Sequence, residues 1–552
     1  MRMSRVVPIL LAIALASAQV PATGQQMATV DLAQVDSLFE RFDGTRNPGC
    51  AVGVSEGGYI ILERAYGMAD LEHDVPNGPE TVFEPGSVSK QFTAAATILL
   101  ALDGKLALDD DVRKYIPELP EYEAPITVRH LLNHTSGLRD WGSVAGIEGW
   151  PRTTRVHTHT HMLDIASRQN SLNYQPGDYY SYTNTGYNLQ AVLVERVSGM
   201  SFAEFSQQRI FEPLGMTKTE WRDDFTRIVK DRSIGYSPNR GGGWSMLMPF
   251  ENVHGNGGLL TTVGDLLRFT HNLETGELGG PRFLEEMHRQ GVLNSGRTIA
   301  YASGLFIGEY KGVREVQHSG GTAAYRGFLT RFPDQGLAVS VMCNAGNANP
   351  GRLARQVAEL YLGDALSETE PTVAGEIDLS LVRLEALAGG YRDARTGQHV
   401  RVAVADGALR LQGVELVPVS ETRFESPNGV VLEVETTPMA EGRPAAMLDT
   451  PVADDVRLEP VGDFEPTAAQ LTEYPGTYRS PEAEAVYRVE IEDGALVLKN
   501  RYGEGRQLTP VYRDAFTASR RTFIFHRDGA GQVTGMSWSE SRVWDLRFER
   551  MD

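Results

Sequence analysis

The sequence predicts an α+β protein of several domains: a region of mixed helices and strands, followed by two small antiparallel β domains. Three observations support this fold class. The chain has 552 residues, too many for a single hydrophobic core. Both β-rich and helix-forming runs occur in its first two thirds. The last third carries an internal repeat of short alternating strands with few helix signals.

The N-terminus has the features of a secretory signal peptide. Arg2 and Arg5 precede the apolar run 6–15, and the small residues 16–18 form an A-x-A site. We expect cleavage after Ala18, with an uncleaved anchor as the alternative. Residues 1–18 are therefore assigned to a signal peptide. No later stretch is apolar enough to span a membrane, so a periplasmic or secreted protein is expected.

The composition argues against two classes of partner. The formal net charge is −20, and an acidic surface repels nucleic acid and anionic membranes. A small molecule or short peptide is the expected partner, and the sequence does not indicate the oligomeric state.

The two cysteines, Cys50 and Cys343, each lie in an apolar run. This favours buried free thiols over a bridge, although an exported protein can form one.

The first β-rich stretch predicts a hairpin. Residues 50–54 and 59–66 are separated by a Glu-Gly-Gly turn. Ser55 lies in this stretch within a Gly-x-Ser-x-Gly pattern, which marks a nucleophile only between a strand and a helix. A turn and a second strand follow here, so Ser55 is interpreted as a hairpin residue.

A candidate nucleophile follows at Ser87. Residues 84–90 read Glu-Pro-Gly-Ser-Val-Ser-Lys and lead into the helix-forming run 91–100. Ser87 is therefore expected at or just inside a helix N-terminus, with Lys90 one turn on and on the same face. An amine kept neutral by burial can accept the proton of a serine hydroxyl. The alternative is a helix cap beside a solvated lysine.

Histidines elsewhere are interpreted as structural. A short helix is predicted from Thr127 to Gly137, and His134 lies among turn formers near its end. His157, His159 and His161 could share a face only in an extended segment, whereas the following residues predict a helix that would spread them. Thr160 also occupies the position where a metallo-hydrolase signature needs aspartate. We expect no metal and no cofactor.

Two further motifs place polar groups on turns. Tyr182 and Asn184 precede the predicted helix 189–197, which puts a phenol and an amide on the same side of the chain. The phenol could act as a general acid or base, or it could simply pack in the turn. His318-Ser319-Gly320-Gly321 ends a β-rich run, where glycine permits close backbone approach to a ligand. A polar hairpin is the alternative there.

In this order and at these separations, the motifs Ser87-x-x-Lys90, Tyr182-x-Asn184 and His318-Ser319-Gly320 resemble the serine β-lactamase and penicillin-recognising family, in its class C-like branch. Connecting stretches at 106–110, 131–138 and 257–266 are similar too. The resemblance covers about residues 30–365. It implies a β-lactamase/transpeptidase-like fold, in which an antiparallel sheet flanked by helices adjoins a helical subdomain, with the site between them.

The resemblance also implies roles for these residues. Ser87 would be the acylated nucleophile, and Lys90 the base or proton relay. Tyr182 would pass the proton to the leaving group and help to activate the deacylating water, and which of Lys90 and Tyr182 is the acylation base stays open. Asn184, His318 and Gly320 would bind substrate, and the backbone N–H groups of Ser87 and Gly321 would form the oxyanion hole.

One departure from the family concerns the substrate. β-Lactamases and D,D-carboxypeptidases usually carry Lys-Thr-Gly where this chain has His318-Ser319-Gly320. A histidine near its reference pKa is mostly neutral and binds a carboxylate weakly. His-x-Gly is instead similar to D-stereospecific aminopeptidases and related amidases and esterases.

The C-terminal repeat supports the same comparison. Residues 389–393 match 476–480, and 406–409 match 493–496, at the same spacing of 87 residues (391 to 478 and 406 to 493). A linker at 366–380 would join the catalytic domain to β-barrel-like repeats at 381–463 and 464–552. D-Aminopeptidases of this family resemble this layout, with two lipocalin-like β domains, one of which sends a loop to the active site. The sequence does not indicate which loop.

The sequence thus predicts an exported serine hydrolase that works through an acyl-enzyme, with amides or peptides of D-amino acids as substrates. A class C-type β-lactamase or a carboxylesterase on the same site is one alternative. A non-catalytic penicillin-binding sensor is another. An α/β-hydrolase using Ser55 is the weakest.

Overall fold

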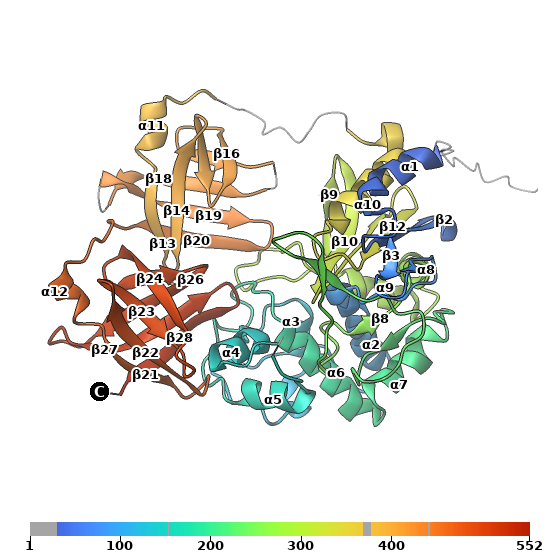
Figure 1. The fold of residues 1–552 in the computed structure, drawn as a ribbon, viewed down its shortest axis with the longest axis horizontal. Coiled ribbons are helices and arrows are strands. Elements are labelled where there is room, and N and C mark those ends of the chain that lie inside the picture. The colour runs from blue at the N-terminus through green and yellow to red at the C-terminus, as the bar shows by residue number, and fades with distance from the viewer. Residues whose placement is uncertain (1–29, 153, 368–376, 428, 440–441, 552) are drawn as a thin grey trace, which may run out of the picture.

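The computed structural model describes residues 30–551, apart from 153, 368–376, 428 and 440–441. The predicted signal peptide at 1–18 and part of the predicted linker lie outside the described residues. Figure 1 shows a mixed domain of helices and strands on one side and two β-barrels on the other. Among the described residues, no helix is long and apolar enough to cross a membrane.

The mixed domain is organised on a six-stranded antiparallel sheet in the order β2-β1-β12-β11-β10-β9. Its first two strands are the predicted hairpin, and the last four come from the other end of the domain. The strands are β1 (Cys50–Glu56), β2 (Tyr59–Tyr66), β9 (Phe306–Tyr310), β10 (Val313–Thr322), β11 (Tyr325–Phe332) and β12 (Leu337–Cys343).

Helices cover both faces of this sheet because successive side chains of a strand point to opposite faces. Val52 and Val341 join one core with α1 (Leu32–Phe39) and α10 (Pro350–Leu362). Ala51 and Met342 join the other core with α8 (Val263–Thr275). The central strands are therefore buried on both faces, and β12 is buried over its whole length.

The helical subdomain packs around α2 (Lys90–Leu102), in which residues 90–100 are all buried. Alanine and leucine predominate in this helix, and both are strong helix formers. The remaining helices of the domain are α3 (Val128–Leu132), α4 (Trp141–Glu148), α5 (His159–Ser167), α6 (Asn184–Ser198), α7 (Phe202–Ser206) and α9 (Gly280–His288), with 3-10 turns η1 (Glu40–Phe42), η2 (Gly86–Ser89), η3 (Val112–Lys114) and η5 (Gly363–Ala365) and a π-turn η4 (Gln207–Phe211).

Short two-stranded pairs connect these elements. They are β3 (Met68–Asp70) with β4 (Val75–Pro76), β5 (Glu220–Trp221) with β8 (Leu259–Leu260), and β6 (Tyr236–Pro238) with β7 (Trp244–Met246).

The helix predicted at 127–137 is shorter than expected. Thr127 caps its start, accepting a hydrogen bond from the His130 N–H, but α3 ends at Leu132 because His134 has a left-handed backbone conformation, with φ of 59°. This conformation cannot continue a right-handed helix, and it turns the His134 ring into the interior, where the residue is 1% exposed.

The expectation of two free thiols is wrong, because Cys50 and Cys343 form a disulfide. β1 and β12 pair antiparallel with Cys50 directly opposite Cys343, and the two Cα atoms are 3.9 Å apart. The two residues are separated by 293 positions in the chain. The sequence could not indicate the bridge because only the pairing of the two strands brings the thiols together.

The last third of the chain forms two closed antiparallel barrels of eight strands each, as the fold prediction required. Short helices α11 (Leu381–Glu385) and α12 (Ala468–Leu471) precede them. The first barrel comprises β13 (Gly389–Asp393), β14 (His399–Ala405), β15 (Ala408–Leu411), β16 (Val414–Pro418), β17 (Arg423–Glu425), β18 (Val431–Pro438), β19 (Pro444–Thr450) and β20 (Ala453–Pro460). The second comprises β21 (Gly476–Ser480), β22 (Ala485–Glu492), β23 (Ala495–Lys499), β24 (Gly505–Tyr512), β25 (Ala515–Ala518), β26 (Arg521–Arg527), β27 (Val533–Glu540) and β28 (Val543–Arg550).

The repeated residues have the same structural role in both barrels. The hydroxyl of Tyr391 donates to the Leu387 carbonyl, and that of Tyr478 donates to the Tyr474 carbonyl, which closes the start of each barrel. The Asp-Gly pairs at 406–407 and 493–494 all have positive φ, as the tight hairpin turn β14–β15 and its counterpart β22–β23 require.

The second barrel packs on the helical subdomain. Arg139 is 3% exposed and its guanidinium donates to the Glu482 carboxylate at 2.7 Å. The Tyr487 hydroxyl donates to the Ile147 carbonyl at 2.8 Å. Apolar residues of this barrel join the same core cluster as those of the helical subdomain. The turn that joins β27 to β28 is thereby held against the start of α4, where the Arg542 carbonyl accepts from the Asp140 N–H at 3.3 Å and from the Asn173 Nδ2 at 3.2 Å.

Candidate active site

Ser87 lies in the turn η2, immediately before α2, as the sequence predicted. Gly86 has φ of +57°, and a Cβ there would lie 2.5 Å from the Gly321 backbone nitrogen. Only glycine avoids both the strained conformation and the clash. Gly86 therefore allows the Ser87 turn to lie directly against the end of β10.

Lys90 is fully buried and contacts Ser87, as the motif predicted. Its Nζ lies 2.9 Å from the Asn184 Oδ1, 2.7 Å from the Asn256 carbonyl oxygen and 3.2 Å from the Ser87 Oγ. Burial, followed by the charge of Arg542, holds the pKa of Lys90 well below its usual value. A neutral amine has two N–H donors and one lone pair. With the donors on Asn184 and Asn256, the lone pair can accept the Ser87 proton.

Tyr182 approaches Ser87 from the turn before α6. The Lys90 Nζ lies 4.8 Å and the Arg542 guanidinium 4.9 Å from the centroid of its ring. Its hydroxyl is buried and has no hydrogen-bond partner among the described residues. Burial raises the pKa of Tyr182 well above its usual value, and the nearby Ser87 hydroxyl and Arg542 offset only part of that shift. The phenol is therefore protonated at neutral pH.

Asn184 is the first residue of α6, and Asp140 fixes its position. The Asp140 Oδ2 accepts from the Asn184 N–H at 2.8 Å, and its Oδ1 accepts from the Ser143 N–H at 3.0 Å. Asp140 thus caps α4 and α6 together, as aspartate commonly does at helix starts. Because the Asn184 Oδ1 accepts from Lys90, the Nδ2 donor is left for another partner.

His318 is brought to the site, but both its ring nitrogens are already engaged. The residue is 2% exposed. Its Nδ1 lies 2.6 Å from the Ser319 carbonyl oxygen and its Nε2 lies 3.1 Å from the Tyr301 hydroxyl. Burial, with a smaller effect of Lys90, lowers the pKa of His318 to about 3. The ring is therefore neutral at any physiological pH and cannot attract a carboxylate by charge.

The glycines after His318 permit a backbone contact that no other residue would allow. A Cβ on Gly320 would lie 1.9 Å from the Pro85 carbonyl oxygen and 2.6 Å from the Ser87 backbone nitrogen. A Cβ on Gly327, opposite Gly320 on β11, would lie 2.9 Å from the Pro85 Cα. The end of the β10–β11 hairpin therefore lies on the Ser87 turn, with the Gly321 and Ser87 backbones adjacent.

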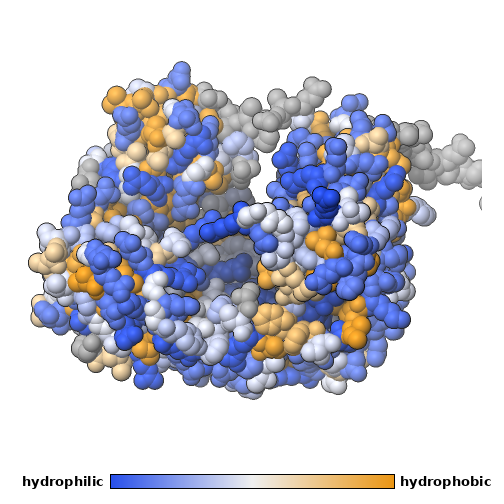
Figure 2. All heavy atoms as spheres, viewed as in Figure 1, coloured by the Kyte–Doolittle hydropathy of each residue, from blue (hydrophilic) through white to orange (hydrophobic). Residues whose placement is uncertain are grey.

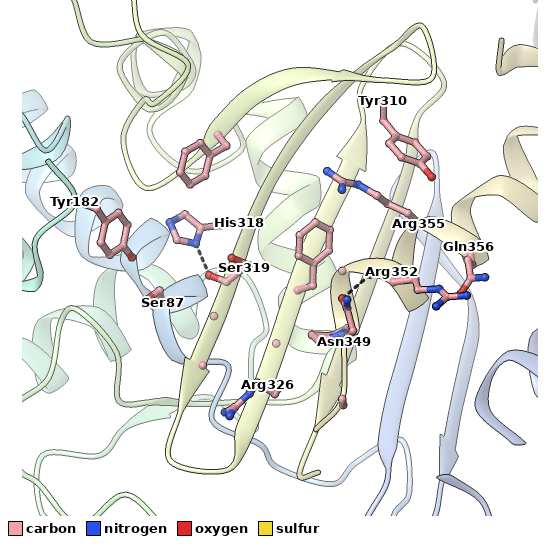
Figure 3. Close-up of a pocket in the computed structure, with 18 of the residues that line it drawn as sticks. Ser87, Tyr182, Tyr310, His318, Ser319, Arg326, Asn349, Arg352, Arg355 and Gln356 are labelled. Carbon is pink, nitrogen blue, oxygen red and sulfur yellow. Dashed lines mark hydrogen bonds between the residues drawn. The ribbon is translucent and has the colours of Figure 1, made fainter. Parts of the chain in front are cut away.

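A cavity of about 1220 Å³ opens beside these residues, lined by Ser87, Tyr182 and His318 (Figure 3). Both barrels contribute to its wall, through Val452 in the β19–β20 turn and Arg542 in the β27–β28 turn. Figure 2 shows the surface notched between the first barrel and the mixed domain. The loops that reach the cavity are thus identified by the structure.

The cavity wall carries an excess of positive charge. Its charged residues are Arg326, Arg352, Arg355, Arg542 and Glu359. The Arg355 guanidinium pairs with Glu315 at 2.6 Å, and the Glu359 carboxylate pairs with Lys311 at 2.6 Å. These ion pairs neutralise the charges of Arg355 and Glu359. Arg352 forms no ion pair within the described part of the chain. Arg542 lies 3.7 Å from the Asp140 carboxylate, which offsets part of its charge. Together with Arg326 and Arg352, its partly exposed guanidinium makes this wall suited to an anionic group.

Three residues of the site were missed by the sequence interpretation. Asn256 and Asp140 position Lys90 and Asn184, and Arg542 lies over Tyr182. Asn256 directly precedes the 257–266 stretch that resembles the family, and Asp140 precedes a helix, which is a capping signal. No sequence signal indicates Arg542, because it lies in a short turn of a distant barrel.

Two other residues considered in the sequence have structural positions. Ser55 is on β1, opposite Ala338 of β12, so it is a strand residue as interpreted. His134 packs against Tyr182 and Tyr187, with ring centroids 4.2 and 5.1 Å away, and its Nδ1 accepts from the Thr183 N–H. His134 therefore helps to hold the Tyr182 turn in place.

A buried ion pair fixes the segment that leads to Ser87. The Arg222 guanidinium donates to both oxygens of Glu84 at 2.9 Å, and their side chains are 2% and 0% exposed. Because replacing Glu84 with glutamine leaves the buried Arg222 charge uncompensated, we expect E84Q to lower the free energy of unfolding by about 3–5 kcal/mol, measured by urea denaturation.

The matched control is Asp334→Asn, which removes the exposed ion pair with Arg314. We expect D334N to change the free energy of unfolding by less than about 1 kcal/mol. Equal effects of the two substitutions would contradict a positioning role for the Glu84–Arg222 pair.

Comparison with known proteins places these features in a family. A family model described as Beta-lactamase matches residues 35–362. The chain is 28% identical to a D-aminopeptidase of Gluconobacter oxydans (strain 621H), across 94% of this chain and 98% of that protein. It is 30% identical to a penicillin-binding protein of Bacillus subtilis (strain 168), across 71% of this chain and 90% of that protein.

Solved structures give the same fold. An octameric penicillin-binding protein homologue from Pyrococcus abyssi matches with a TM-score of 0.56 and 25% identity, covering 78% of this chain and 99% of that chain. A D-stereospecific amidohydrolase from Streptomyces matches with a TM-score of 0.52 and 23% identity, covering 60% of this chain and 99% of that chain.

Proposed function

The chain belongs to the Beta-lactamase family, and from this we propose that it is a D-aminopeptidase-like serine hydrolase acting on peptides or amides of D-amino acids through an acyl-enzyme on Ser87. Relatives named D-aminopeptidases align over more than nine tenths of this chain, so the alignment includes the barrel region. The single observation that carries the proposed chemistry is the contact between the buried Lys90 amine and the Ser87 hydroxyl.

In the first step, Lys90 accepts the Ser87 proton while Oγ bonds to the substrate carbonyl carbon. The depressed pKa of Lys90 and the raised pKa of Tyr182 favour Lys90 as the base, since the phenol holds its proton at neutral pH. The C–N bond then breaks, and the leaving nitrogen takes a proton from Tyr182, which regains one from Lys90. Water adds to the ester and gives a proton to the same pair. The Oγ–C bond then breaks, the proton passes on to Oγ to restore the Ser87 hydroxyl, and the acid is released.

The backbone supplies the oxyanion hole in this proposal. The Ser87 and Gly321 N–H groups would donate to the carbonyl oxygen as it gains charge, and Gly86 and Gly320 permit the approach that brings these backbones together. Such preorganised donors are worth about 10²–10³-fold in kcat. The Asn184 Nδ2 would donate to the substrate amide, which fixes the acyl group beside Ser87.

The charge of the cavity wall narrows the class of substrate that we expect. His318 is neutral, which removes the charge that a lysine would supply, but Arg352 and Arg542 place positive charge on the wall. A short peptide with an N-terminal D-residue carries a carboxylate on its leaving part and fits this wall. The alternative on the same site is a class C-type β-lactamase or carboxylesterase, favoured by the same arginines and by the penicillin-binding relative.

A substrate panel tests the proposal. We expect turnover of a D-alanyl peptide and of D-alanyl p-nitroanilide, with the matching L-alanyl compounds as stereochemical controls. Nitrocefin and a short p-nitrophenyl ester measure the two alternatives. A kcat/KM for nitrocefin above that for both D-alanyl substrates would refute the D-aminopeptidase proposal and support the β-lactamase.

The β27–β28 turn provides a second test, through Arg542. Its charge is one of the causes that lower the pKa of Lys90, so removal of the charge raises that pKa. Below its pKa, Lys90 is protonated and cannot act as a base. We therefore expect R542A to move the acidic limb of the kcat/KM profile to higher pH and to raise KM about tenfold for a peptide with a free carboxylate.

The matched variant R542K keeps the positive charge and is expected to retain the position of the acidic limb. A D-alanyl anilide, which has no carboxylate, should show the pH shift without the large KM effect. An unchanged profile in R542A would contradict electrostatic coupling between the second barrel and Lys90.

We also propose that the protein is exported. The N-terminal segment has the pattern of a signal peptide, and the Cys50–Cys343 bridge suits an oxidising compartment, where disulfides persist. Fractionation of cells that produce the full-length chain, followed by N-terminal sequencing, would place the mature protein and its first residue.

A further inference from the structure

Three side chains with metal-ligand chemistry meet beside the active site, in a group that the proposed reaction does not use. His159 is the first residue of α5, Glu195 lies in α6, and His254 lies in the segment before β8. One ligand atom from each lies within 4.8 Å of the others. We refer to His159, Glu195 and His254 as the His-Glu-His cluster.

The two imidazoles are held in a form that suits a metal. The His254 Nδ1 lies 3.0 Å from the Asn252 carbonyl oxygen, which assigns the proton to Nδ1. The His254 Nε2 is then a bare lone pair, and it is buried without a partner among the described residues. His254 is only 6% exposed. A buried nitrogen that lacks a partner needs an explanation in a native structure.

His159 shows the same arrangement. Its Nε2 lies 3.0 Å from the His254 carbonyl oxygen and 3.3 Å from the His254 backbone nitrogen. With the proton on Nε2 and donated to the nearer carbonyl, the Nδ1 lone pair is left for another partner. A backbone carbonyl on the second ring nitrogen is the usual way in which proteins orient a metal-binding histidine.

We propose that the His-Glu-His cluster binds a divalent transition-metal ion of the zinc type. Two imidazoles and one carboxylate, with water in the fourth position, form a donor set that Zn²⁺ takes, whereas Mg²⁺ and Ca²⁺ prefer oxygen ligands. Glu195 would compensate part of the ion's charge. His159 and Glu195 are only partly buried, so the ion can enter from solvent.

The neighbouring histidines do not belong to this site. The His157 Nε2 lies 3.1 Å from the Trp150 carbonyl oxygen, and its ring packs against Trp141. The His161 Nδ1 accepts from the Thr158 N–H in the cap of α5. The helix therefore separates the three histidines of the tract, as expected, and only His159 joins the cluster.

The competing interpretation is aromatic packing. His254 lies 4.3 Å from the His159 ring, 5.7 Å from Phe202 and 6.2 Å from Trp221 between ring centroids. Packing alone explains the buried carbon edges of the ring. It does not supply a partner for the His254 Nε2. The Glu195 Oε1 accepts from the Phe202 N–H at 3.3 Å, and this hydrogen bond does not engage the His254 Nε2 either.

The site would connect the metal to the segment that holds Lys90. The His254 carbonyl accepts from the Asn188 Nδ2 at 2.6 Å, and the Asn256 carbonyl, two residues on, accepts from Lys90 at 2.7 Å. An ion on His254 would fix this segment to α5 and α6. We therefore assign the ion a structural role and expect it to raise the melting temperature.

Zinc titration of the full-length protein tests the proposal. After dialysis against EDTA, we expect calorimetry to show one equivalent of Zn²⁺ bound, and bound Co²⁺ to give the absorption of a four-coordinate site. We expect E195Q and H159Q each to weaken Zn²⁺ affinity at least about tenfold. The control is E72Q, in the exposed Asp70–Glu72–His73 group, the other triad of possible ligands among the described residues.

The outcomes separate the two interpretations. Retained binding in E72Q together with weakened binding in E195Q and H159Q supports the His-Glu-His cluster. No zinc binding by the unmodified protein, or binding that depends on Glu72 alone, overturns the proposal. Circular dichroism of each variant in EDTA shows whether it is folded, and H159Q, at a partly exposed position, provides a second folded variant if E195Q is unstable.

Discussion

Replacing Ser87 with alanine is expected to lower kcat by about 10⁴–10⁶-fold on the best substrate of the panel, because removal of a nucleophile leaves only binding and the oxyanion hole. The Ser87 Oγ is the hydroxyl within reach of the Lys90 Nζ. KM should change little, because the cavity wall is intact. Initial rates of S87A and the unmodified protein, measured on the same substrate, provide the test.

The matched control is S55A. Ser55 also lies in a nucleophile-like pattern, but it is a buried residue of β1 and pairs with β12. We expect S55A to keep nearly full activity. Full activity of S87A together with loss of activity in S55A would overturn the assignment of the nucleophile.

Mass spectrometry of the same proteins examines the sensor alternative. A D-alanyl ester or a penicillin should add one acyl group to the unmodified protein and none to S87A. An enzyme loses this adduct rapidly, whereas a penicillin-binding sensor keeps it. An adduct on Ser87 that persists with every acyl donor would contradict a hydrolase.

Replacing Lys90 with methionine is expected to lower kcat by about 10³–10⁴-fold, within the range given for loss of a general base. Methionine has a similar length and suits the fully buried position. The Ser87 hydroxyl would remain in place without a proton acceptor. Rates of K90M across pH should show no acidic limb attributable to an amine.

The variant K90R separates the role of the base from that of the charge. Arginine keeps a cation at this position but cannot lose its proton in the accessible pH range. If Lys90 acts as a base, K90R should be as inactive as K90M. Substantial activity in K90R would indicate that Lys90 acts as a fixed cation, and the base would have to be sought in Tyr182.

Local sequence patterns predicted most of the elements that carry the site. The Pro-Gly pair before an alanine-rich run predicted the Ser87 turn and α2, because such residues set backbone conformation within a few positions. The Glu-Gly-Gly turn predicted the β1–β2 hairpin for the same reason. The Asp-Gly turns at 406 and 493 and the repeated Tyr391 and Tyr478 predicted two similar β domains.

The roles of several residues depended on packing that local patterns do not encode. The expected substrate-binding role of His318 stays a prediction. The structure adds that its two ring nitrogens contact the Tyr301 hydroxyl and the Ser319 carbonyl. The helix expected to reach Gly137 ends at Leu132, because the buried position of His134 requires a left-handed residue.

The sequence by itself thus determined the elements, the order of the motifs, the family resemblance and the pairing of a serine with a lysine one turn away, all of which depend on neighbours in the chain. Only the tertiary structure decided that Lys90 is buried with a pKa well below its usual value, that Cys50 meets Cys343, and that Arg542 reaches Tyr182 from the second barrel. The physical reason is distance along the chain: burial and pairing between residues hundreds of positions apart follow from the assembled fold, and burial sets the pKa values on which the chemistry depends.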